Sequence, residues 1–272
     1  MNENLIILVA TGPSYKIYVP YYIACLAYTN PECDILVFTD DSIVKNFDRA
    51  LDIAKKMFRN KIEIIYNKQL NNQIVNFSYP DFCRALVNPK YYDMYKYVYI
   101  GDIDLLITET NIFKKHIDHT EKLGISFSNW ARYPLSLKRM SGLHFINVPE
   151  YLKRYRQKIE YYIENKNLLV EQGFKNDEDS LYFILDEDEK SKCNKILYRN
   201  FHGIHLGALR TYDGTYAGLI SRLLSCTADG SIVSYIKDIL IIIQKEEFKN
   251  IHDLLQDFKV NLLYTIKGID IN

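Results

Sequence analysis

Two aspartates separated by one residue, Asp102 and Asp104, follow an apolar and aromatic run at 97–100 and a glycine, Gly101. In an extended backbone, side chains two positions apart share a face, so both carboxylates can point together out of the end of a buried strand. Two close carboxylates repel each other unless a positive group lies between them. Hard oxygen ligands suit Mg²⁺ or Mn²⁺, so the sequence predicts a divalent-metal site. The alternative is a pair of strand-end carboxylates that cap a following helix.

The chain contains two further Asp-x-Asp sequences, at 177–179 and at 186–188. The one at 186–188 lies in a run of charges and is typical of a solvated turn. Only Asp102 and Asp104 have a hydrophobic run before them, a glycine at the turn and apolar residues after them. That context makes this pair the candidate for chemistry.

The first part of the chain alternates short apolar runs with helical patterns. Runs that predict buried strands lie at 5–10, 34–39, 61–66 and 97–100, because strands covered on both faces read as continuous apolar segments. Helical patterns lie at 15–28, 43–58 and 80–86. The alternation predicts an α/β layered sheet. Ligands of such sheets bind beyond the carboxyl ends of the strands, where Thr11, Asp40 and the Asp-x-Asp pair all fall.

The later part of the chain changes character towards its end. Further strands are predicted at 125–128, 144–148 and 195–198, and helices at 150–165 and 179–185. From 218 onward the pattern is helical and lacks strands, with segments at 219–224, 232–244 and 248–258. We therefore expect a catalytic domain at 1–215 and a helical C-terminal appendage at 216–272.

Bulk properties narrow the class of protein. The 272 residues include 34 basic and 34 acidic side chains, and the absence of a basic surplus argues against a nucleic-acid partner. The five cysteines form no C-x-x-C pair, which predicts reduced thiols rather than zinc or a disulfide framework. With no signal-peptide pattern and no apolar run of roughly 18 residues, we expect a cytoplasmic protein. An apolar stripe at 232–243 leaves peripheral contact of the C-terminal helices with the inner face of a membrane open.

The strand, Asp-x-Asp and strand at 97–107 resemble a segment of the GT-A fold nucleotide-sugar glycosyltransferases of the retaining type. The chain is most similar to glycosyltransferase family 8, which includes glycogenin and lipopolysaccharide galactosyltransferases, and the similarity covers 5–210. The resemblance implies a Rossmann-like mixed sheet flanked by helices. It also implies that Asp102 and Asp104 hold Mn²⁺ or Mg²⁺ against the donor diphosphate, and that Asp102 and Ile103 contact the nucleotide sugar. The metal would offset charge on the leaving diphosphate.

Two more segments carry the resemblance to this family. Arg84 ends the segment 78–84, and the family has an arginine at a similar distance from its Asp-x-Asp motif. A guanidinium there would neutralise the carboxylates or the phosphate; the alternative is an exposed helix arginine. The segment 141–147 is similar to a glycine turn that faces the donor sugar, although Met140 stands where the family commonly has Asn. Within it, His144 is expected to be a core or sheet-edge residue.

The acidic segment 176–181 resembles the family's acidic segment before a helix. By that resemblance Asp177 would hydrogen-bond donor-sugar hydroxyls, and Glu178 would lie at the β face of the anomeric carbon. A carboxylate there could be a nucleophile or could stabilise oxocarbenium-like charge. The alternative is that Asp177 caps the following helix while Asp179 favours its positive end.

The segment 201–210 is similar to the end of the family's active site. The resemblance implies that His205 ligates the metal and that Arg210 contacts the diphosphate, with His202 as a competing metal ligand. At the nucleotide end, Thr11 and Tyr15 follow the first strand, and Tyr15 could stack on uracil.

Two assignments rest on weaker patterns. Asp40 ends the second strand and could bond the base or ribose, but it also reads as ordinary turn chemistry, as do Thr11 and Tyr15. His116 and His119 look like a metal cluster, although the lysines around them indicate an exposed helix instead.

Together these features predict a metal-dependent transferase. It would pass a hexose from a UDP-sugar, UDP-galactose or UDP-glucose, to a hydroxyl of a glycan or glycolipid acceptor with retention, in bacterial surface polysaccharide or lipooligosaccharide synthesis. Two alternatives stay open. One is a non-catalytic carbohydrate- or nucleotide-binding protein on the same scaffold, and the other is an inverting transferase that uses Glu178 as a general base.

Overall fold

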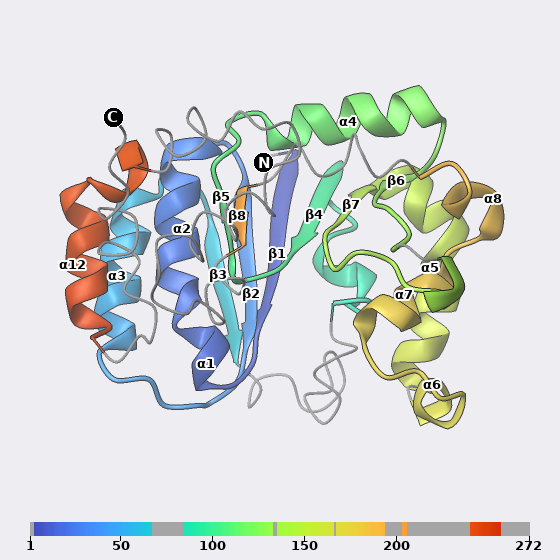
Figure 1. Cartoon of the computed structure of the whole chain (residues 1–272), viewed down its shortest axis with the longest axis horizontal. Helices are drawn as coiled ribbons and strands as arrows, with labels where there is room; N and C mark the ends of the chain where they lie inside the picture. The colour runs from blue at the N-terminus through green and yellow to red at the C-terminus, as the bar shows by residue number, and fades with distance from the viewer. Residues whose placement is uncertain are drawn as a thin grey trace.

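Six strands form one mixed sheet in the computed structural model, in the order β3-β2-β1-β4-β7-β6 (Figure 1). The structure describes residues 3–66, 84–132, 135–165, 167–193, 203–205 and 240–256. The strands are β1 (Asn4–Ala10), β2 (Asp34–Thr39), β3 (Ile62–Tyr66), β4 (Tyr97–Gly101), β6 (Phe127–Ser128) and β7 (His144–Asn147). The first four are parallel to one another, and β7 runs antiparallel to both β4 and β6. The predicted α/β sheet is confirmed.

Helices cover both faces of this sheet. On one side in Figure 1 lie α1 (Pro13–Lys16), α2 (Tyr18–Thr29), α3 (Phe47–Met57) and α12 (Glu246–Leu254). α4 (Ile112–Leu123) packs in the same core as α2 and α3. To the right in Figure 1 lie α5 (Val148–Glu164), α6 (Asn167–Glu171), α7 (Asp177–Ile184) and α8 (Glu187–Lys190). Short 3-10 turns lie at Pro89–Tyr91 and Leu135–Leu137.

Alternate residues of β1 enter two separate cores, as the period of a strand requires. Ile6 and Leu8 pack in the core that α2, α3 and α12 cover. Leu5 and Ile7 pack in the core that α5 and α7 cover. Because both faces are buried, the central strands read in the sequence as continuous apolar runs.

A second, two-stranded sheet leaves the main one just after the Asp-x-Asp sequence. It pairs β5 (Leu105–Ile107) antiparallel with β8 (Gly203–His205). The close approach requires a glycine at 203, because a Cβ there would clash with the carbonyl oxygen of Leu106. The segment around 203–205 is thereby brought next to the candidate metal turn.

The described part of the C-terminal region packs on the main domain. Phe248 and Ile251 of α12 are buried in the same core as α2 and α3, and α12 contacts both of those helices. The boundary between 1–215 and 216–272 stays a prediction, and the helices expected at 219–224 and over most of 232–244 lie outside the described residues. In the part of the chain that the structure describes, no helix has the length and apolar character needed to cross a membrane.

Some element boundaries differ from the sequence predictions. The helix expected from 43 begins only at Phe47, because Asn46 adopts a left-handed backbone with φ of 60°. The pattern at 15–28 is divided into α1 and α2 at Ile17. Residues 84–86 form a turn rather than the expected helix. The strand expected at 195–198 lies outside the described residues.

Candidate active site

Polar residues converge at the carboxyl edge of the parallel strands. β1 is hydrogen-bonded to β2 on one side and to β4 on the other, with Ala10 opposite Thr39 and Leu8 opposite Gly101. Thr11, Asp40 and the Asp-x-Asp pair therefore follow the ends of three neighbouring strands. This is the edge at which open α/β sheets bind ligands.

Asp102 and Asp104 lie in a turn between β4 and β5. The backbone N–H of Leu105 donates to the carbonyl oxygen of Asp102 at 3.1 Å, so the pair does not continue the extended strand that the sequence predicted. Asp104 is buried and Asp102 is partly exposed. Ile103 packs in the apolar core, so any contact it makes with a nucleotide sugar would come from its backbone.

Arg84 joins this turn to a distant acidic segment. Its guanidinium forms one ion pair with Asp102 and a second with Asp177, the latter at 2.5 Å. It also donates to the carbonyl oxygen of Gly142 at 3.4 Å. The Arg84 side chain is 22% exposed, which contradicts the alternative of an exposed helix arginine. Arg84 thus lies between two carboxylates that the sequence places far apart.

Gly142 makes room for this ion pair. A Cβ at position 142 would lie 2.8 and 3.0 Å from the two terminal nitrogens of Arg84 and 3.0 Å from a carboxylate oxygen of Asp102. Distances this short force the guanidinium to move. A side chain at position 142 would therefore displace the Arg84 guanidinium from its place beside Asp102.

The first turn of α7 carries three acids. Asn176 is the N-cap, and its side-chain oxygen accepts from the backbone N–H of Asp179 at 3.0 Å. The alternative in which Asp177 caps this helix is wrong, since Asn176 does so. Acids in a first turn are favoured by the helix dipole, and the side chains of Asp177 and Glu178 form ion pairs away from the helix backbone.

Glu178 lies between two arginines that the sequence predictions missed. Its two carboxylate oxygens pair with Arg132 and Arg139, and the Arg139 contact is 3.0 Å. Burial raises the pKa of Glu178 from its ordinary value of 4.5, as does the nearby charge of Asp177, while Arg132 above all opposes the rise. The only available signal was a basic stretch between two predicted strands, and nothing in it indicated a partner.

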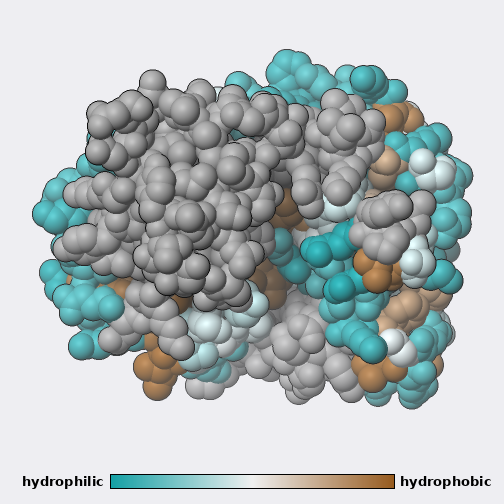
Figure 2. Space-filling model, viewed as in Figure 1, coloured by the Kyte–Doolittle hydropathy of each residue, from teal (hydrophilic) through white to brown (hydrophobic). Residues whose placement is uncertain are grey.

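The side chains of the candidate site are mostly charged. Figure 2 shows hydrophilic residues on the exposed face beside the residues drawn in grey, over the region where β7 and α7 lie in Figure 1. Five carboxylates take part in the site, at positions 102, 104, 177, 178 and 179, and three guanidinium groups, at 84, 132 and 139. The charged side chains at these eight positions therefore carry an excess of two negative charges.

The backbone of His205, the predicted third metal ligand, lies beside the Asp-x-Asp turn. In the pairing of β5 with β8, His205 lies opposite Leu105. Leu105 is the residue that follows Asp104. The side chain of His205 is not described, and His202 and Arg210 lie outside the described residues. Among the side chains that are described, no group of three His, Cys, Asp or Glu is arranged to hold a metal ion.

At the nucleotide end, Asp40 ties two loops together. Its carboxylate accepts from the backbone N–H of Gly12 at 2.7 Å and of Ser42 at 3.0 Å. These hydrogen bonds lower the pKa of Asp40 even though burial acts to raise it. The Ser42 contact is that of an ordinary turn, whereas the Gly12 contact joins the loops that follow β1 and β2. Tyr15 is partly exposed on α1 and Thr11 precedes it.

Three histidines expected to matter little for chemistry are buried. The helix expected around His116 and His119 is present as α4, but the two histidines do not lie on its exposed side as expected. Both are buried, and the Nδ1 atoms lie 2.8 and 2.7 Å from the hydroxyl of Ser128. His144 is a core residue, as expected, and burial lowers its pKa to about 3.

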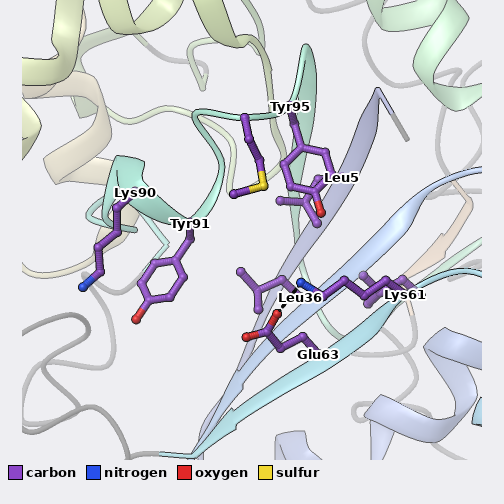
Figure 3. Close-up of a pocket in the computed structure, with 9 residues that line it drawn as sticks. Leu5, Leu36, Lys61, Glu63, Lys90, Tyr91 and Tyr95 are labelled. Carbon is purple, nitrogen blue, oxygen red and sulfur yellow. Dashed lines mark ion pairs between the residues drawn. The ribbon is translucent and has the colours of Figure 1, made fainter. Parts of the chain in front are cut away.

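A separate cavity of about 190 Å³ opens at the other edge of the sheet (Figure 3). Leu5 and Ile35, each the second residue of its strand, form part of its lining. Lys61 and Glu63 pair across 2.7 Å on one wall, and Tyr95 lies on another. The cavity is thus at the amino ends of the strands, away from the Asp-x-Asp turn.

Several solved glycosyltransferase structures are similar to this chain. The chain is similar to the apo form of glycosyltransferase GlyE of Streptococcus pneumoniae TIGR4, at 13% identity and a TM-score of 0.44, over 68% of this chain and 44% of that one. It is similar to galactosyltransferase LgtC in complex with donor and acceptor sugar analogues, at 13% identity and a TM-score of 0.36, over 65% of this chain and 69% of that one. For the bifunctional glycosyltransferase WbbM the identity is 10% and the TM-score 0.47, over 94% of this chain and 52% of that one.

The chain therefore spans less than half the length of GlyE. No protein-family model and no curated protein matches its sequence. The three solved structures named above are glycosyltransferases.

Proposed function

We propose that this chain is a metal-dependent glycosyltransferase that moves a hexose from a UDP-sugar to a glycan hydroxyl with retention at the anomeric carbon. The observation that supports it most directly is the Arg84 bridge. Arg84 pairs with Asp102 of the Asp-x-Asp turn and with Asp177 of the acidic segment. The two segments for which a metal and a sugar role were predicted are thus joined by one side chain, which supports assigning them to one site.

The chemistry of the donor set fits a hard dication. Asp102 and Asp104 offer carboxylate oxygens, which Mn²⁺ and Mg²⁺ prefer, and His205 would be the third ligand. The excess of two negative charges among the described side chains of the site is the charge that one dication would balance. When bound, the ion would offset negative charge on the leaving diphosphate, and Arg210 is proposed to contact the same diphosphate.

The other residues of the site have separate proposed roles. Arg84 would hold the carboxylates of Asp102 and Asp177 at a fixed separation, because a planar guanidinium can engage two carboxylates at fixed geometry. Asp177 would accept hydrogen bonds from donor-sugar hydroxyls. Glu178 would lie near the anomeric carbon, where a negative charge stabilises the positive charge that develops as the sugar–oxygen bond breaks.

The donor and acceptor classes follow from the family resemblance. UDP-galactose or UDP-glucose is the proposed donor, with Thr11, Tyr15, Asp40 and the backbone of Ile103 at its nucleotide end. The acceptor would be a glycan or glycolipid of a bacterial cell surface. We propose that the chain works in the cytoplasm, where contact with the inner face of the membrane would bring it to a glycolipid acceptor.

The decisive experiment measures UDP release from a panel of UDP-sugars in the presence of Mn²⁺, with NMR analysis of the product. We expect turnover with UDP-galactose or UDP-glucose, an anomeric coupling constant that reports retention, and loss of turnover on chelation of the metal. Asp104→Asn should reduce the rate by at least about 10²-fold, since it removes a charged ligand. Asp118→Asn, which changes an exposed carboxylate paired with Lys114 on α4, is the matched control and should leave the rate unchanged.

Other outcomes would select the alternatives. Inverted product stereochemistry would favour the inverting transferase, with Glu178 as base. UDP binding by calorimetry without turnover would favour the non-catalytic binding protein. Absence of UDP binding with Mn²⁺ present would overturn the proposal.

A further inference from the structure

A hairpin-like loop between β6 and β7 carries two arginines to the acidic end of the site. The backbone N–H of Arg132 donates to the carbonyl oxygen of Arg139 at 2.8 Å, and that of Ser141 donates to Trp130 at 3.0 Å. A β-bridge between 131 and 140 completes the base of the loop. Arg132 and Arg139 are therefore held opposite each other by the backbone.

Both arginines reach the same carboxylate on another element. Arg132 pairs with one oxygen of Glu178 and Arg139 with the other, and Nε of Arg139 lies 2.8 Å from Asp179. The loop also contacts the main chain of α7, because the backbone N–H of Met140 donates to the carbonyl oxygen of Glu178 at 3.1 Å. One loop thus fixes both the backbone and the two carboxylate oxygens of Glu178.

We propose that Arg132 and Arg139 are positioning residues that hold the Glu178 carboxylate ionised and in a single orientation at the sugar end of the site. This inference rests on the proposed function. It adds to that function a requirement for Arg132 and Arg139, close to Gly142, which accommodates the Arg84 bridge.

Charge and burial explain why Glu178 needs two partners. The Glu178 side chain is 10% exposed, and an isolated carboxylate in such a place favours its neutral form. Asp177 next to it acts in the same direction, whereas Arg132, Arg139 and Arg84 favour the charged form. Without the pair on the loop, Glu178 would bind a proton more readily.

Geometry explains why the partners are arginines. Two guanidiniums on separate carboxylate oxygens restrict rotation of the side chain, and Arg139 reaches Glu178 and Asp179 with different nitrogens. A lysine would supply the charge as a single flexible ammonium and could not reproduce this fork. A lysine variant therefore separates the effect of charge from the effect of orientation.

The test compares Arg132→Gln, Arg139→Gln and the corresponding lysine variants with the wild type, as kcat and donor KM across pH. For each glutamine variant we expect kcat to fall by about 10- to 100-fold, donor KM to stay within about threefold, and the acid limb of the pH profile to move to higher pH. The lysine variants should restore the position of the acid limb but only part of kcat. Arg156→Gln changes a partly exposed arginine of α5 that pairs with Asp93 and Glu160; it is the control and should match the wild type.

A glutamine variant could lose activity because it is less stable, so a second comparison uses the same arginine substitutions in a Glu178→Gln background. In a Glu178→Gln background, neither arginine substitution should reduce kcat further, because the group that they hold is gone. An equal further loss in that background, or an unchanged pH profile and kcat in all four variants, would overturn the inference while wild-type turnover stands. If the wild type itself turned over no donor, the proposed function would fail and this inference with it.

Discussion

Arg84 and Asp177 form an ion pair of 2.5 Å between a β3–β4 connection and the first turn of a helix that lies much later in the chain. The same guanidinium contacts Asp102 in the turn after β4. The sheet brings the three together, because Asp102 follows a central strand and α7 packs in the core that covers that strand's face. A single arginine therefore couples the proposed metal turn to the proposed sugar-binding acids.

Replacing Arg84 should separate these two halves of the site. In Arg84→Ala, Asp102 and Asp177 lose their shared partner and repel each other, so we expect turnover to fall by about 10²- to 10³-fold. Arg84→Lys keeps the charge without the fork and should recover only part of the rate. The measurement is UDP release at saturating donor, with the unfolding midpoint of each variant recorded alongside. An alanine variant within about threefold of the wild type would argue against a bridging role.

Gly142→Ala should impair the same bridge without removing any charge. The added Cβ would meet both terminal nitrogens of Arg84 and a carboxylate oxygen of Asp102 at 2.8–3.0 Å, so the guanidinium must shift and the ion pairs must lengthen. We expect at least about a tenfold loss of turnover at near-native stability.

Gly124→Ala is the control for that substitution. Gly124 ends α4 with φ of 61°, and a Cβ at this position would meet no other atom within 4 Å. Its replacement should therefore cost about 1 kcal/mol of backbone strain and leave turnover unchanged. Full activity of Gly142→Ala would mean that the Arg84 bridge tolerates a side chain at position 142.

Much of the fold could be predicted because buried parallel strands have a simple signature. The apolar runs at 5–10, 34–39 and 97–100 became β1, β2 and β4 with boundaries within one residue. Local backbone choices were harder to predict. Because Asn46 adopts a left-handed conformation, α3 begins later than the sequence pattern predicted. The turn at Asp102 replaces the extended geometry expected from the alternation of side chains.

The site was predicted only as far as each residue's own neighbourhood allowed. Asp102, Asp177 and Glu178 belong to acidic motifs, which by themselves indicated metal-binding or sugar-binding roles. Arg132 and Arg139 act on a carboxylate in another element, and such a pairing depends on the tertiary fold, which spacing along the chain does not encode. Likewise, the lysines around His116 indicate an exposed helix, although the histidine side chain itself packs against Tyr99 and Phe145.

Burial of His144 should make the stability of the protein depend on pH. The pKa of His144 is lowered from 6.5 to about 3 by burial, and its Nδ1 accepts from Asn129 at 3.0 Å. Between pH 6.5 and about 3 the unfolded chain therefore binds a proton that the folded chain does not. The free energy of unfolding thus falls as the pH falls, by about 1 kcal/mol per pH unit for one such group. Urea unfolding of the wild type and of His144→Gln at about pH 7, 6 and 5 tests this dependence.

His144→Gln should be less stable than the wild type at neutral pH, but its free energy of unfolding should depend less steeply on pH. His252→Gln serves as the comparison, because that histidine is only half-buried beside Tyr21 and its replacement should change the slope less. Identical slopes for the wild type and His144→Gln would contradict the assignment of His144 as a buried neutral group.

The described tail helix offers a test of whether the C-terminal region folds as part of the main domain. Phe248 of α12 is buried, with its ring 6.4 Å from those of both Tyr21 and Tyr28 on α2. Phe248→Ala should lower the free energy of unfolding by about 3–5 kcal/mol and shift a single cooperative transition. Ile241→Ala, at a side chain that is 60% exposed, should change it by less than about 0.5 kcal/mol. A Phe248→Ala variant that showed a separate early transition, with the main one unshifted, would mean that the residues after 215 form an independent appendage.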